Sequence, residues 1–94
     1  MFGLIGKMRA APGSRDELVA ILSDGTQAMP GCISYVVAED PTDADAIWIT
    51  EVSDSEDSHK ASLQLPEVKA AIAKGRPLIA GFDMSVKTKP VAGV

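Results

Sequence analysis

The 94-residue sequence lacks the features that mark several large classes of protein. Its one cysteine, Cys32, cannot form an internal disulfide, so we expect the chain to fold in a reducing compartment such as the cytoplasm. Residues 1–10 lack a basic segment followed by a long apolar one, so we expect no secretory signal. No apolar run approaches the length that a membrane-spanning helix needs, and we expect no membrane partner.

Basic residues are too few and too scattered to indicate binding to nucleic acid. Nine lysines and arginines oppose thirteen acidic residues, which gives a formal net charge of −4. Binding to nucleic acid begins with neutralisation of phosphates, so we predict no such partner. A content of 46% hydrophobic and 23% charged residues is typical of a globular protein, and we expect residues 1–94 to form a single domain with a modest core.

Signals for organic cofactors and metal ions are also missing. The glycine-containing turn Pro12-Gly13-Ser14 lacks the Gly-x-Gly-x-x-Gly spacing that cradles the phosphates of a dinucleotide. Glu56 and His59 have the spacing of a helical metal motif, but no second such pair and no cysteine pair accompanies them. Lys60 also offers Glu56 an ordinary helical ion pair. We therefore predict neither a cofactor nor a metal site.

Periodicity in the first half of the chain predicts a strand, a helix and a hairpin. Residues 2–10 are apolar enough for a strand, and a capping box of Ser14 and Glu17 precedes a helix that reaches about Gly25. Two further runs are rich in β-branched and aromatic residues and are separated by a polar turn, a pattern typical of a hairpin. These runs are residues 32–39 and 47–53.

Two helices are predicted in the second half. Ser53 and Glu56 form another capping box, which predicts a short helix beginning at Asp54. Pro66 suits the first position of a further helix, and Gly75 suits its end.

A last strand completes the pattern. Phe82, Met84 and Val86 alternate with polar residues, so we expect them to share one apolar face. The order strand-helix-strand-strand-helix-helix-strand predicts a ferredoxin-like α+β fold, with an antiparallel sheet and helices on one of its faces. The second face of such a sheet stays uncovered, and we expect a homodimer to cover it.

Two ionisable residues are candidates for chemistry. His59, the one histidine, titrates near neutral pH and so suits removal of a proton from a phenol, although a lone histidine is often structural or solvated. Glu51 has β-branched neighbours and would be costly to bury unpaired. We expect Arg76, Lys74 or a backbone amide to satisfy Glu51, and a role as general base is the alternative.

Several apolar and aromatic residues are candidates for a pocket. Trp48 and Tyr35 each offer a flat apolar face with one polar group, which suits an aromatic ligand, and the alternative is a role in the core or a dimer interface. Flexible apolar side chains could complete such a pocket or simply fill the core. These are Met8, Met29, Phe82 and Met84.

The C-terminal half also carries a pattern similar to a known family. It consists of Glu51-Val52, an acidic turn, His59, Ser62-Leu63, Leu65-Pro66-Glu67-Val68 and finally Arg76-Pro77-Leu78-Ile79. In this pattern the chain resembles the antibiotic biosynthesis monooxygenase family, and within it the small proteins labelled quinol monooxygenases.

This resemblance implies a dimeric α/β barrel, in which two sheets pack face to face. It implies a cofactor-independent monooxygenase that uses dioxygen on a small electron-rich aromatic molecule of quinol type. His59 and Glu51 would be the catalytic residues. The substrate would be bound by Trp48, Tyr35, Leu63 and Ile72. Members of the family often carry tryptophan where this chain has Ser53, so we expect a void there that opens a pocket between the sheet and the two C-terminal helices.

Two departures from the family pattern keep other functions open. Ser53 replaces the frequent tryptophan, and the sequence contains no asparagine, a residue that some active members use. Both favour a non-catalytic dimeric module that binds a small apolar ligand. A proton-transfer isomerase is a further alternative, because one fold supports many chemistries.

Overall fold

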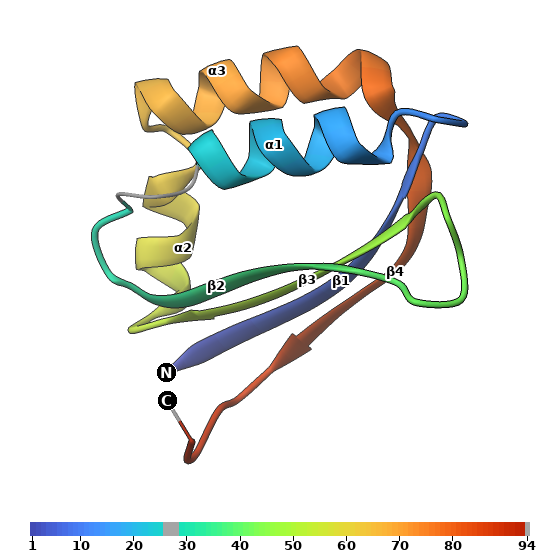
Figure 1. The fold of residues 1–94 in the computed structure, drawn as a ribbon. Coiled ribbons are helices and arrows are strands. Elements are labelled where there is room, and N and C mark those ends of the chain that lie inside the picture. Colours follow the sequence, from blue (N-terminus) through green and yellow to red (C-terminus); the bar gives the residue numbers. More distant parts are fainter. Residues whose placement is uncertain (26–28, 94) are drawn as a thin grey trace.

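The computed structural model describes residues 1–25 and 29–93 (Figure 1). The elements are β1 (Phe2–Ala10), α1 (Arg15–Gly25), β2 (Cys32–Glu39), β3 (Ala46–Ser53), α2 (Glu56–Ser62), α3 (Pro66–Gly75), the 3-10 turn η1 (Arg76–Leu78) and β4 (Ile79–Thr88). The predicted order of strands and helices is confirmed, and Pro66 and Gly75 begin and end α3 as expected. No helix in the described ranges is long and apolar enough to cross a bilayer.

The four strands form one antiparallel sheet in the order β2-β3-β1-β4. Helices α1 and α3 lie side by side over one face, and α2 lies at the end of the sheet where β3 leaves it (Figure 1). This confirms the ferredoxin-like α+β fold. We call the face beneath the helices the helix face and the opposite one the open face.

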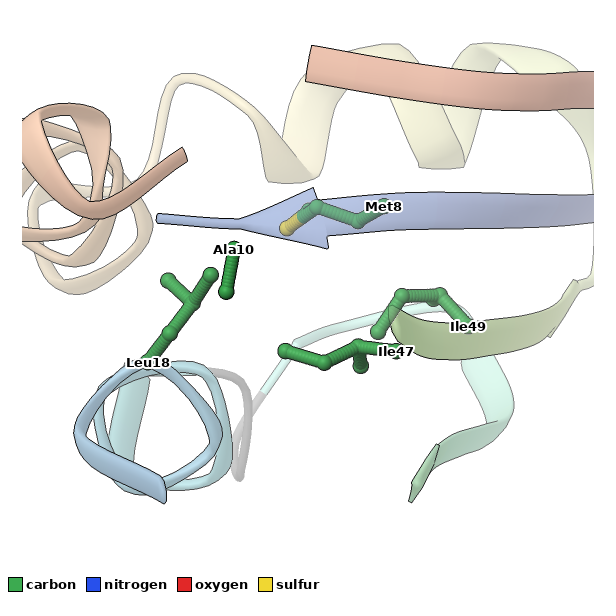
Figure 2. Close-up of a cluster of buried hydrophobic side chains, with 5 residues drawn as sticks. All are labelled: Met8, Ala10, Leu18, Ile47 and Ile49. Atoms are coloured by element: carbon green, nitrogen blue, oxygen red, sulfur yellow. The ribbon is translucent and has the colours of Figure 1, made fainter. Parts of the chain in front are cut away.

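The centre of the helix face holds the main hydrophobic core (Figure 2). Leu18 of α1 points toward the side chains of β1 and β3, and both Leu18 and Ile47 are completely buried. The other members of this cluster are Met8, Ala10 and Ile49. Burying each large aliphatic side chain contributes about 1.5–3 kcal/mol, so this cluster fixes α1 against the sheet.

Helix α2 begins two residues later than its predicted start at Asp54. Ser55 is its N-cap, and the Ser55 hydroxyl accepts a hydrogen bond of 3.1 Å from the backbone N–H of Ser58. Ser53 still belongs to the ladder of β3, so its backbone is extended and its side chain lies on the helix face beside Glu51. The prediction that Ser53 caps the helix is therefore wrong.

Strand β4 does not alternate regularly. Lys7 of β1 lies opposite Met84, but the next residue, Met8, lies opposite Phe82, so Asp83 is an extra residue in β4. Such a β-bulge shifts the alternation of the strand by one residue. Phe82 therefore shares the helix face with Met8, while Met84 shares the open face with Lys7. The expectation that the alternating apolar residues of β4 share one face is wrong.

The open face has an apolar part and a charged part. Val36, Thr50, Ile5 and Val86 form a row across all four strands, and the two valines are well exposed. No element of the described chain covers this row. Its exposure agrees with an uncovered sheet face, and the homodimer that would cover it stays a prediction.

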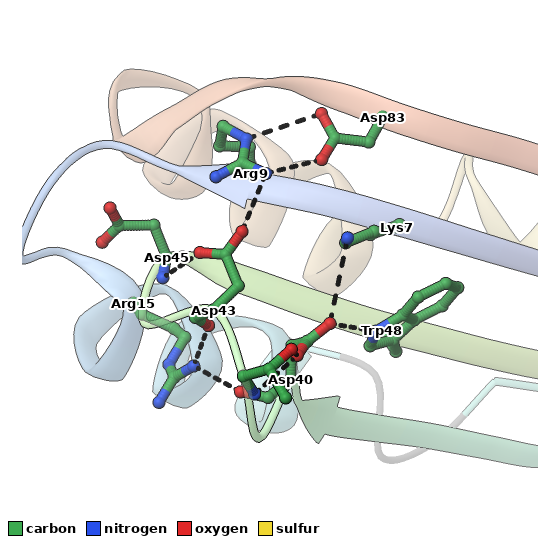
Figure 3. A network of polar contacts seen from close by, with 9 residues as sticks. Lys7, Arg9, Arg15, Asp40, Asp43, Asp45, Trp48 and Asp83 are labelled. Atoms are coloured by element: carbon green, nitrogen blue, oxygen red, sulfur yellow. Dashed lines mark hydrogen bonds and ion pairs between the residues drawn. The ribbon is translucent and has the colours of Figure 1, made fainter.

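The charged part lies toward the turn between β2 and β3 (Figure 3). Nη2 of Arg9 donates to Asp43 at 2.9 Å and to Asp83 at 2.7 Å, so one guanidinium connects the turn with β4. Nζ of Lys7 lies 5.4 Å from the centre of the Trp48 ring, and the Trp48 indole N–H donates to Asp40 at 2.9 Å.

Candidate functional site

Glu51 of β3 is the buried acid of the helix face. Its side chain is almost fully covered, with a relative exposure of 5% for the residue. Oε2 accepts a hydrogen bond of 3.0 Å from the hydroxyl of Ser53 and lies 2.6 Å from Nδ1 of His59. The expected partners Arg76 and Lys74 take no part, because they lie at the far end of α3 and are exposed.

His59 reaches Glu51 because Ser55 starts α2 directly beside the end of β3. The ring of Phe2 packs against the imidazole, with 5.2 Å between centroids. When the Glu51 carboxylate is ionised it can only accept hydrogen bonds, and Nδ1 of His59 is then the nitrogen that donates. The lone pair of the neutral ring then lies on Nε2. No described residue forms a hydrogen bond with Nε2. Nε2 is therefore available to take a proton from a ligand.

Two cavities adjoin this pair on the helix face. The cavity of about 200 Å³ that contains His59, here the His59 cavity, is also lined by Leu4, Gly6, Ile49, Met84 and Ser85. The cavity of about 280 Å³ beneath the helices, here the α3 cavity, is also lined by Leu18, Val68, Ala71 and Ile72. The walls common to both are Met8, Tyr35, Glu51, Leu63 and Phe82. Polar groups are few in both, as is usual for small-molecule sites.

Tyr35 of β2 stands at the junction of the two cavities, directly opposite Glu51 in the sheet. Burial is the main reason that the pKa of Tyr35 rises to about 12, and the negative charge of Glu51 adds to it. The phenol therefore keeps its proton at any physiological pH. No described residue bonds the Tyr35 hydroxyl, so it can donate to a ligand.

The structure brings together most of the residues that the sequence singled out. His59, Glu51, Tyr35 and Leu63 all line the His59 cavity, and Ile72 lines the adjoining α3 cavity. Trp48 lies on the open face, because it stands three positions before Glu51 in β3 and side chains an odd number of positions apart point to opposite faces.

Ser53 does not open the expected void. It is completely buried, it lines neither cavity, and its hydroxyl is bonded to Glu51. Sequence reasoning missed Gly6 and Ser85 as cavity walls. Gly6 carried a signal, since glycine within a strand often marks the close approach of a ligand or backbone. Ser85 carried none, because its orientation depends on the bulge in β4.

Metal-ligating side chains do not gather in the described part of the chain. No group of three or more histidine, cysteine or acidic side chains there could hold a metal ion. Glu56, the other half of the Glu-x-x-His pair, forms an ion pair of 2.9 Å with Lys87 of β4.

The chain is similar to known proteins in sequence and in fold. The profile of the antibiotic biosynthesis monooxygenase family matches residues 1–74. A crystal structure from Chloroflexus aurantiacus, named as a candidate antibiotic biosynthesis monooxygenase, is 67% identical in sequence. The similarity covers 99% of this chain and 95% of that one, with a TM-score of 0.97.

More distant structures under the same name share the fold. One from Deinococcus radiodurans is 22% identical over 100% of this chain and 96% of its own, with a TM-score of 0.78. One from Nitrosomonas europaea is 9% identical over 98% of this chain and 100% of its own, with a TM-score of 0.87. No protein with curated annotation matches the chain.

Proposed function

Because the chain belongs to the antibiotic biosynthesis monooxygenase family, we propose that it is a cofactor-independent monooxygenase acting on a small electron-rich aromatic molecule of quinol type. The observation that carries this proposal is the pair of His59 and Glu51, 2.6 Å apart, in the wall of an apolar cavity. The pair supplies a base, and the cavity supplies a largely apolar space beside it.

The first step is removal of a proton from the bound quinol. Nε2 of His59 accepts the phenolic proton, and the carboxylate of Glu51 stabilises the imidazolium through Nδ1. Ser53 holds the carboxylate in place through its hydroxyl. A base of this kind contributes about 10²–10⁴-fold to the rate of proton transfer.

The quinol anion is electron-rich enough to reduce dioxygen itself. In the net reaction one oxygen atom enters a ring C–H bond and the other leaves as water, while the quinol loses its hydroxyl hydrogens and becomes a hydroxyquinone. All the electrons that dioxygen accepts come from the substrate, and the proton held by His59 returns to the departing water. The protein's share is to bind the substrate, deprotonate it and exclude water.

The size and chemistry of the two cavities support an aromatic substrate. A dry apolar cavity of about 150 Å³ holds a benzene ring, so the His59 cavity, at about 200 Å³, has room for one ring of a quinol. Tyr35 supplies a hydroxyl donor for a substrate oxygen at the junction with the α3 cavity. The α3 cavity then offers space for an apolar substituent or a further ring.

We also propose that the protein works as a homodimer with a dimeric α/β barrel. The exposed apolar row on the open face supports this arrangement, since such a face in contact with water is unfavourable. A second copy that packs its own sheet against this row would bury it without disturbing the cavities on the helix face.

The test is oxygen uptake with a panel of hydroquinones, without added metal or flavin. We expect consumption by the wild type and a loss of about 10²–10⁴-fold in His59→Ala. Lys60→Ala is the matched control, because Lys60 is the next residue of α2 and is exposed to solvent. Unchanged uptake in His59→Ala would refute the role of the base. Ligand binding without uptake in the wild type would favour the non-catalytic module, and conversion without uptake would favour an isomerase.

A further inference from the structure

We infer that Phe82 is a specificity-determining wall of the cavities, and that Arg9, acting through Asp83 from the open face, is a positioning residue that holds Phe82 there. The inference rests on the proposed function in one respect, because it takes the cavities as the substrate site. It adds that residues on the open face influence the size of substrate that the cavities on the helix face accept.

The bulge in β4 decides where Phe82 points. Without the extra residue Asp83, Phe82 would share the open face with Met84. With it, Phe82 lies directly opposite Met8 on the helix face and borders both the His59 cavity and the α3 cavity. Bulges often re-aim a side chain beside an active site. The wall formed by Phe82 therefore exists only while the bulge is kept.

Phe82 itself has little that holds it in place. Its relative exposure is 65%, so most of the ring has no protein atoms packed against it. It stands on the outermost strand of the sheet, where it borders both cavities and a shallow hollow beside Ile72 and Arg76. A ring with so few contacts takes its direction mainly from its backbone.

Arg9 holds this part of the backbone from the other side of the sheet (Figure 3). Its Nη2 donates to Oδ2 of Asp83 at 2.7 Å, and its Nε lies 3.5 Å from Oδ1, so the guanidinium grips the carboxylate with two nitrogens. Arg9 follows directly after Met8, the residue opposite Phe82. Strand β1 therefore holds the bulge on the open face through Arg9, and it lies opposite Phe82 on the helix face through Met8.

The clamp is anchored at its other end. The same Nη2 of Arg9 donates to Asp43 in the turn between β2 and β3 at 2.9 Å. A single exposed ion pair contributes little to stability, but a forked arrangement with a second anchor restricts geometry better. Arg9 lowers the pKa of both Asp43 and Asp83 by its hydrogen bonds, so the clamp stays charged at neutral pH.

The first test reads the position of Phe82 directly by NMR. The chain has only two phenylalanines and four methionines, so a contact between the ring of Phe82 and the methyl group of Met8 can be assigned. We expect this nuclear Overhauser effect in the wild type, and at least a twofold loss of its intensity in Asp83→Asn. Asp40→Asn is the matched control, since it also neutralises an aspartate in the charged part of the open face, but Asp40 contacts Lys7 and Trp48 and not the Arg9 side chain. An undiminished effect in Asp83→Asn would overturn the positioning role.

The second test reads the wall through binding of phenol and 1-naphthol, measured by calorimetry. We expect Phe82→Ala to raise the ratio of the dissociation constants, phenol over 1-naphthol, by about 2–10-fold, because the smaller ring loses an aromatic contact. Asp83→Asn should shift the ratio in the same direction by less, and Asp40→Asn should not shift it. An unchanged ratio in Phe82→Ala, or no binding of either phenol to the wild type, would refute the role of Phe82 as a wall of the substrate site. Neither test measures oxygen, so failure of the proposed reaction would be seen separately.

Discussion

The helix face and the open face of this sheet are built from the same four strands, yet each handles its charged groups differently. On the helix face Glu51, the one buried carboxylate among residues 1–25 and 29–93, sits among apolar side chains and is satisfied by a histidine and a serine. On the open face Arg9 is shared by two aspartates, Asp43 and Asp83, and all three side chains reach water. Burial therefore governs the charged groups of the helix face, and neighbouring charges govern those of the open face.

This difference predicts where a substitution will matter. An interaction in a water-excluded cavity is stronger than the same interaction in water, and its loss leaves a group that nothing else can satisfy. An exposed pair loses little, because water replaces the missing partner. Changes on the helix face should therefore alter function and stability far more than matched changes on the open face.

The largest expected effect comes from Glu51→Gln. The amide cannot stabilise an imidazolium at His59, so we expect turnover of a hydroquinone to fall by about 10²–10⁴-fold. The variant should fold, because glutamine has the same shape and can bond Ser53 and His59. Asp40→Asn is the equivalent change in the charged part of the open face and should leave turnover unchanged. Comparable losses in both variants would break the distinction between the faces.

The second effect concerns stability. Ile47 on the helix face is 0% exposed, and Ile47→Ala should lower the free energy of unfolding by about 2–5 kcal/mol. Val36 on the open face is 52% exposed in the single subunit, so Val36→Ala should change this free energy by about 0.5 kcal/mol or less at concentrations where the protein is monomeric, and by more where the proposed homodimer forms. Chemical denaturation at several protein concentrations checks both. A cost at Val36 that grows with concentration would show that a second copy covers the open face.

The smallest expected effect is the change in folding stability with pH. It tests whether burial or a neighbouring charge shifts the pKa values on each face. Tyr35 is the one tyrosine, so its absorbance should report a pKa of about 12. Because burial raises this pKa above its ordinary value of 10.0, the resulting stability is complete below pH 10.0 and is lost as the pH rises toward 12. Glu51→Gln should lower the pKa of Tyr35 only slightly, since the charge of Glu51 is the lesser cause.

Asp83 on the open face should show the opposite behaviour. Hydrogen bonds from Arg9 hold its pKa below the ordinary value of 3.8, so its contribution to stability is complete above pH 3.8 and is lost as the pH falls through the folded-state value. Carboxyl NMR signals should report this pKa, and Arg9→Gln should return it to the ordinary range.

A Tyr35 pKa that fell to 10.0 in Glu51→Gln would mean that charge, not burial, governs the helix face.

The elements of the fold were predictable because their signals are local. Alternation, capping residues, Pro66 and Gly75 each act within a few residues, and the structure agrees with them closely. The bulge at Asp83 could not be predicted in this way, because it is a property of the pairing between β4 and β1. The start of α2 was missed for a similar reason, since the length of the β3 ladder decides that Ser55 and not Ser53 is free to cap.

The site was predictable as far as alternation reaches. Glu51 faces the helices, and the odd spacing in β3 already places Trp48 on the other face. The partner of Glu51 was not predictable, because Arg76 and His59 are both plausible from charge alone. Only the packing of α2 against β3 brings His59 within 2.6 Å.

The edge strands also affect how two copies of this protein could associate. β2 and β4 are the edge strands of the sheet, and each leaves a row of backbone N–H and C=O groups without a neighbouring strand. Register shifts interrupt β2 near Ser34 and β4 at Asp83 and Ala80, so neither margin offers an evenly spaced row to an incoming strand. Natural sheets use such irregularities to prevent end-to-end growth into fibres. The extra residue that turns Phe82 inward therefore also favours closed association through a face over open polymerisation along a margin.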